Sequence, residues 1–140
     1  MFVLNPERVK FGSAVWGNVV SVKIDSETVA PVEEWGESGP WCVLVDSPRR
    51  RVKIEVKQEL HGVADGLAPA TIGSEAQLRV HVSPTGSNAG RKRVKVQAVV
   101  VSVSHERRVG AAPVRTIELR GVSASGSADP VSIESAEVGE

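Results

Sequence analysis

One long stretch, residues 90–106 (GRKRVKVQAVVVSVSHE), limits what this chain can fold into. Over residues 94–100 the apolar side chains occupy alternate positions, with Lys95 and Gln97 between them, as in a strand with one buried face. The alternation then changes phase, and over residues 99–104 the odd-numbered positions are the apolar ones. Because a strand usually changes its buried face at a bend or a bulge, we expect this stretch to be the central strand of an all-β domain.

The overall composition is that of a soluble globular protein with one domain. The chain has 140 residues, of which 41% are hydrophobic, and its formal net charge is zero. No apolar run approaches the roughly 18 residues that a membrane span needs, and the N-terminus lacks the long apolar segment of a signal peptide. We therefore expect folding in the cytoplasm and no membrane insertion. Aromatic residues make up only 4% of the chain, which argues against a carbohydrate or single-strand nucleic-acid binder.

Further strands are indicated by the same alternation elsewhere in the chain. Three segments show it well, and three weaker segments bring the expected number of strands to about seven. Residues 60–72 contain two glycines and a proline, so they predict an irregular crossover with room for a short helical turn at residues 63–67. This pattern predicts a β-sandwich or a partly closed barrel. The clear strands cover residues 20–25, 52–57 and 77–82, and the weaker ones residues 27–35, 41–45 and 114–123.

The two ends of the chain differ in composition from its middle. Residues 1–18 show no clear period and are expected to form an N-terminal arm, ahead of a β domain at residues 19–123. Residues 124–140 are rich in Ser, Ala and Gly and have four carboxylates and no basic residue after Ala128. We expect this acidic tail to be flexible unless a neighbour holds it.

Residues that could carry catalysis or bind a metal give no coherent pattern. The three histidines, His61, His81 and His105, are far apart and lack a ligand-spaced partner, so each is expected to lie at the surface. The single Cys42 cannot form an internal disulfide and is expected to be a small buried hydrophobe. No nucleophile elbow or phosphate-binding glycine loop occurs. The sequence therefore predicts neither an enzyme nor a cofactor.

Charged residues are segregated along the chain. Basic clusters lie at strand ends, whereas acids gather in the segment 27–37 and in the tail. A DNA-binding patch would normally come with a basic excess, which leaves solvated strand ends or a head-to-tail contact between copies. Trp35 and Trp41 flank the acidic loop and either pack across a hairpin or project as contact residues. The candidate contact residues are Arg49, Arg50, Arg51, Glu33, Glu34, Glu37, Trp35, Trp41, Arg91, Lys92, Arg93, Arg107 and Arg108.

From about residue 19 to residue 133 the chain resembles the tail tube proteins of tailed bacteriophages. The resemblance is carried by an early strand pair that ends in the acidic loop and by four segments in a fixed order. These segments are SPRRRVKIEVKQEL (47–60), GSEAQLRVHV (73–82), RKRVKVQAVVVSVSHE (91–106) and VRTIELRGVSASG (114–126). The resemblance to the family lies in the order and composition of these strands, and it involves no catalytic motif.

The resemblance implies a structural, non-enzymatic protein of the virion tail. In that family, copies form hexameric rings that stack into a tube, and double-stranded DNA passes through the channel as non-specific cargo. The lumen of such tubes tends to be acidic, so the resemblance makes Asp129, Glu134 and Glu137 the candidate lumen or tail acids. The expected partners are therefore further copies of the chain and other tail proteins, with assembly in the host cytoplasm. The alternatives are another tail component of the same fold (a terminator, a distal tail protein or a baseplate hub), or a monomeric β-sandwich binding module.

Overall fold

The computed structural model describes residues 2–4, 8–46, 49–60, 71–82 and 92–135, and all regular structure within them is β-strand. Nine of the strands form one antiparallel sheet with the order β1-β4-β7-β10-β9-β8-β2-β3, and β11 pairs with β9 beside this path. The other two strands, β5 and β6, form a separate hairpin. The bounds are β1 (Phe2–Leu4), β2 (Arg8–Phe11), β3 (Ala14–Trp16), β4 (Val19–Thr28), β5 (Val32–Trp35), β6 (Cys42–Asp46), β7 (Arg50–Glu59), β8 (Glu75–Val82), β9 (Lys92–Glu106), β10 (Val114–Gly121) and β11 (Val131–Ser135).

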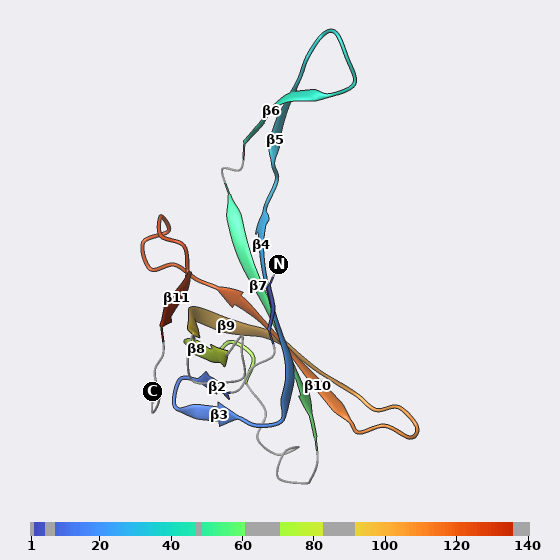
Figure 1. Cartoon of the computed structure of the whole chain (residues 1–140), viewed down its shortest axis with the longest axis vertical. Coiled ribbons are helices and arrows are strands. Elements are labelled where there is room, and N and C mark those ends of the chain that lie inside the picture. The colour runs from blue at the N-terminus through green and yellow to red at the C-terminus, as the bar shows by residue number, and fades with distance from the viewer. Residues whose placement is uncertain (1, 5–7, 47–48, 61–70, 83–91, 136–140) are drawn as a thin grey trace.

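The large sheet curls so that its two halves share one hydrophobic core. Val9 and Phe11 of β2 belong to the same buried cluster as Val22 and Ile24 of β4, although the two strands are far apart in the strand order. In Figure 1, β2, β3, β8 and β9 lie across the long axis that β4 and β7 follow. The path of strands does not close, since β1 and β3 remain at its ends. The expected all-β class is confirmed, in the form of an open, curled sheet.

The change of phase in the central strand is a β-bulge. Glu118 of β10 pairs with Ser102, and the next residue, Leu119, pairs with Val100. Val101 is therefore the extra residue of β9, and its side chain is exposed. With one residue skipped, Val103 packs against the core on the same side as Val100, as the sequence pattern predicted.

Both chain ends contribute strands that the sequence did not predict. Within residues 1–18, the expected N-terminal arm, β2 pairs with β8 and β3. The Phe11 ring stacks on Trp16, with the two ring centroids 5.0 Å apart. Within the tail, β11 pairs with residues 92–96 of β9, directly beyond the point where β10 ends at Ala98. Along this edge of β9, the tail strand β11 thus pairs with the residues that β10 does not reach. The crossover at residues 61–70, with its expected helical turn, lies outside the described residues.

Two burial predictions are wrong. Cys42 and the rest of β6 are exposed, because the β5–β6 hairpin extends beyond the core and no second layer faces it. His81 was expected at the surface but is only 2% exposed. It lies on β8, between β2 and β9 in the sheet.

Candidate assembly surfaces

The β5–β6 hairpin forms a projecting arm, defined here as residues 30–46. Antiparallel pairing of β4 with β7 runs as far as Thr28 and Arg50, and Val29 N donates to Arg49 O at 2.9 Å just beyond it. Ala30 then takes a positive φ of 52°, and Pro31 follows, so the regular ladder is interrupted before β5 begins. The arm therefore continues the long β4–β7 hairpin but stands clear of the core (Figure 1).

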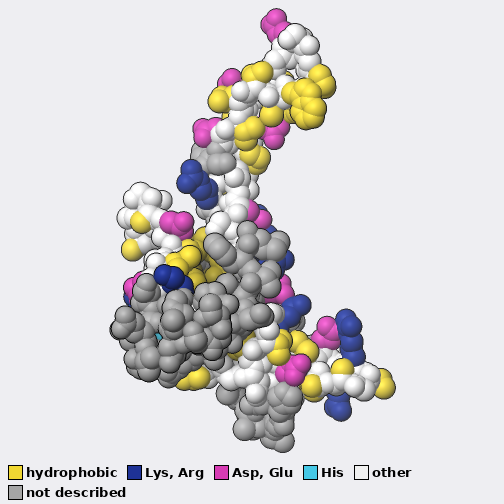
Figure 2. Space-filling model, viewed as in Figure 1, with side chains coloured by type: hydrophobic (Ala, Val, Ile, Leu, Met, Phe, Trp, Pro, Cys, Tyr) yellow, Lys and Arg dark blue, Asp and Glu magenta, His cyan; other side chains and the backbone are white. Residues whose placement is uncertain are grey.

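Apolar side chains on the arm are exposed to an extent that is unusual for a monomer. Trp41 is 82% exposed and Trp35 is 61% exposed, and Val43, Leu44 and Val45 of β6 are exposed as well. Figure 2 shows these apolar groups interspersed with acidic ones along the arm. A concentration of large exposed apolar side chains on one element marks an interaction site or an aggregation liability. Of the two possibilities left open for the tryptophans, their exposure favours projection as contact residues.

The charge of the arm is entirely acidic. Residues 30–46 contain Glu33, Glu34, Glu37 and Asp46 and no Lys or Arg. The basic residues nearest in sequence are at the base of the arm, where Arg49 and Arg50 are exposed. A surface that combines four carboxylates with exposed indoles suits a partner with basic and apolar groups.

At the base of the arm, Arg51, one of the predicted contact residues, already forms an ion pair within the chain. Arg51 Nε donates to Glu27 Oε1 at 2.6 Å, and Lys53 Nζ lies 3.0 Å from the same oxygen. Hydrogen bonds from Lys53 and then Arg51 hold the pKa of the Glu27 carboxyl below its usual value. Arg51 is therefore part of an intrachain network, although it is exposed like its neighbours Arg49 and Arg50.

A second basic cluster holds the C-terminal strand to the body. The guanidinium of Arg93 donates through both Nε and Nη2 to Glu134 Oε1, and Lys95 Nζ lies 3.2 Å from the same atom. Hydrogen bonds from Arg93 first and Lys95 second lower the pKa of Glu134. Glu134, a candidate lumen or tail acid, thus fixes β11 against β9. Asp129 also has a local role, since its Oδ1 accepts a hydrogen bond from Val131 N at 2.9 Å.

The third basic cluster lies at the tip of the hairpin that joins β9 to β10. This tip, residues 106–111, extends past the rest of the sheet, with Val109 fully exposed at its end. Arg108 Nε lies 2.7 Å from Glu106 Oε1, and both side chains are more than half exposed. Arg107 is exposed as well and makes no ion pair with any of the described residues. The tip thus offers two guanidinium groups beside one apolar side chain.

The sequence analysis did not predict a row of three polar side chains that crosses neighbouring strands, two of them buried. Gln58 on β7, Arg115 on β10 and His105 on β9 are cross-strand neighbours, and the first two side chains are buried. Arg115 Nε donates to His105 Nε2 at 3.0 Å, and Gln58 Nε2 donates to Gly17 O at 3.0 Å. Gln58 continues the inward series of β7, and Arg115 lies two residues before the buried Ile117. That placement on an inward-facing series is the signal that could have revealed them.

An open cavity of 490 Å³ lies between the arm base and the loop that leads to β11. The residues that line it include Arg50, Arg51, Ser123 and Ser127.

Among the residues that the structure describes, no group of three His, Cys, Asp or Glu side chains could hold a metal ion. The same residues include no helix long and apolar enough to cross a membrane. Of the predicted contact and tail residues, Arg91 and Glu137 lie outside the described part, and so does His61.

Comparison with known proteins identifies a fold. Neither a protein-family model nor a curated protein sequence matches the chain. Among solved structures, the chain is similar to a chain in the tail of an empty GTA particle that has C6 symmetry. The TM-score is 0.53 at 14% sequence identity, and the match covers 86% of this chain and 85% of the other. The fold of this chain is thus also found in a GTA particle tail with C6 symmetry.

Proposed function

We propose that the chain is a structural subunit whose copies form sixfold rings that stack into the tail tube of a phage-like particle. The observation that carries this proposal is the exposed apolar arm, on a fold shared with a tail chain of C6 symmetry. An isolated subunit leaves Trp35, Trp41 and three aliphatic residues of β6 in water, and a neighbouring copy would cover them. Burial of apolar surface between subunits is what drives most protein association.

The assembled tube conducts double-stranded DNA as non-specific cargo. The chain has no basic excess, with 17 Lys and Arg against 17 Asp and Glu. A subunit without a basic excess has no general affinity for a polyanion, because phosphate binding depends on Lys and Arg neutralising phosphates. Assembly takes place in the host cytoplasm, and the other partners of the subunit are further tail proteins.

The proposal is tested by imaging the purified chain. We expect negative-stain electron microscopy over a concentration series, with light scattering in parallel, to show rings with a central channel and, at higher concentration, tubes. A variant without the arm is the matched control. Because Val29 N donates to Arg49 O, a two-residue Asn-Gly loop in place of residues 30–48 can close the β4–β7 hairpin.

This armless variant keeps the core, since every described residue of β5 and β6 is exposed. We expect it to fold and to remain monomeric at concentrations where the wild type forms tubes. A wild-type chain that stays monomeric at every concentration would overturn the proposed function. Tubes formed equally well by the armless variant would remove the observation on which the proposal depends.

A further inference from the structure

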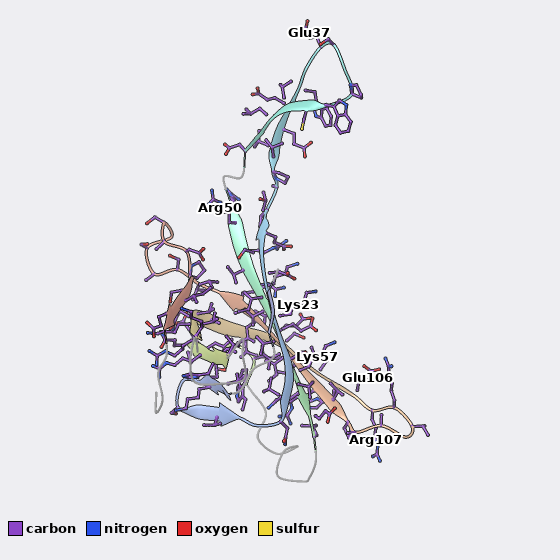
Figure 3. All side chains as sticks on the ribbon, in the orientation of Figure 1. Lys23, Glu37, Arg50, Lys57, Glu106 and Arg107 are labelled. Atoms are coloured by element: carbon purple, nitrogen blue, oxygen red, sulfur yellow. The ribbon has the colours of Figure 1, made fainter. Side chains whose placement is uncertain are left out.

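The arm and the β9–β10 tip leave the body at opposite ends of β7. The arm is attached at Arg50, where β7 begins, whereas Glu59 at the other end of β7 pairs with Val114, where β10 begins. The tip therefore lies beyond the far end of β7. Figure 3 shows this separation, with Glu37 at one extremity of the molecule and Arg107 at another. Two different surfaces at opposite ends are the geometry of a head-to-tail contact.

The chemistry of these two surfaces is complementary. The arm has four carboxylates and no basic residue, whereas the tip has the exposed guanidinium groups of Arg107 and Arg108 and the single carboxylate of Glu106, which pairs with Arg108. Each surface also has exposed apolar groups, namely the indole of Trp41 on the arm and Val109 on the tip. We infer that the acidic arm of one copy docks on the basic β9–β10 tip of the next copy along the tube. This inference rests on the proposed function, and it names the surface that receives the arm.

Apolar contact and charge have separate parts in this docking. Exposed ion pairs each contribute about 0–1 kcal/mol, so Arg107 and Arg108 alone do not hold two copies together. Covering Trp41 and Val109 supplies the larger share and removes water from around the charges, which strengthens their attraction. The arginine–carboxylate pairs then fix which surfaces meet and in which orientation.

Arg49 and Arg50 are the competing acceptor, and their position argues against them. They lie at the base of the arm, at the same end of the body. Because arm and arm base lie at the same end, two copies can each dock their arm on the arm base of the other, and such a reciprocal, twofold contact closes as a dimer. Docking on the β9–β10 tip leaves a free arm and a free tip at the two ends of every assembly, so growth continues. A stacked tube needs the second kind of contact.

A charge exchange tests the contact. The tip variant carries Arg107→Glu and Arg108→Glu, and the arm variant carries Glu33→Arg and Glu37→Arg. All four side chains are at least a third exposed, so each variant should keep the fold, which circular dichroism and thermal unfolding check. We expect each variant alone to raise the critical concentration for tube formation at least about tenfold, the equivalent of about 1.4 kcal/mol per contact. Combining the two should return it to within about threefold of the wild type.

The comparison set contains the arm variant combined with Arg49→Glu and Arg50→Glu. Tubes formed by the tip variant at the wild-type concentration would overturn the inference. Better recovery with the Arg49 and Arg50 reversals than with the tip reversals would overturn it as well. Both results leave the proposed function intact, because the wild type assembles in each. A wild type that forms no tubes would overturn the function and this contact together.

Discussion

Replacing Trp41, at the end of the arm, should weaken assembly while leaving the stability of the subunit unchanged. A fully covered aromatic side chain removes about 150–250 Å² from water. Trp41 is 82% exposed in the subunit, so at about 25 cal/mol per Å² its complete burial by a neighbour is worth about 3–5 kcal/mol before ordering costs. Taking a net loss of about 2 kcal/mol, typical of an interfacial tryptophan, Trp41→Ala should raise the critical concentration for assembly about 30-fold.

The same substitution should leave the subunit itself unchanged. Because the indole makes little contact within the chain, the free energy of unfolding below the critical concentration should change by less than about 0.5 kcal/mol. Sedimentation velocity measures the assembly, and urea unfolding measures the stability. Val15→Ala, at an exposed apolar residue of β3, is the control and should alter neither quantity. Assembly of Trp41→Ala at the wild-type concentration would refute the argument, and so would a clearly destabilised monomer.

Three further predictions concern the subunit. Ile54→Ala on β7, where the side chain is 1% exposed, should lower the free energy of unfolding in urea by about 2–5 kcal/mol. Gly121→Ala should lower it by about 1–3 kcal/mol, because the added Cβ would lie 3.0 Å from Val52 Cβ and 3.2 Å from Val96 Cγ1; an unchanged midpoint would contradict this packing. The pKa of Glu134 in the folded chain is below 4.5, so its contribution is complete above pH 4.5 and disappears as the pH falls through the lower folded value. Amide NMR signals of β11 should therefore shift below pH 4.5, and Glu134→Gln should remove that dependence.

Strands with long period-two patterns could be predicted because the pattern is a local property of the chain. The seven expected strands correspond to β4–β10, and the bulge at Val101 was visible as a change of phase. The strands β1, β2, β3 and β11 have three to five residues each. Segments this short show too few alternations to stand out, and pairing with β4, β8 and β9 gives them their structure.

Exposure of the arm could not be predicted, because it depends on contacts between distant segments, whereas the burial of Gln58 and Arg115 had one local signal, their place on the inward-facing series of β7 and β10. The apolar series of β6 has the composition of a core strand, yet nothing faces it within the described residues. Arginine is usually a surface residue, yet Arg115 is buried beside Gln58, which comes from β7, far away in sequence. In the basic clusters, only contacts within the fold show that Arg51 and Arg93 are paired with Glu27 and Glu134, carboxylates distant in sequence.

The central claim, that a neighbouring copy covers the arm, can be measured with the native sequence. Cys42 is the only cysteine of the chain and is exposed on β6, so the rate at which a maleimide labels its thiol reports how open the arm is. We predict rapid labelling below the critical concentration and strong protection in assembled tubes, with a bulky maleimide added beforehand blocking assembly. Tubes whose Cys42 reacts as fast as that of the monomer would contradict the claim.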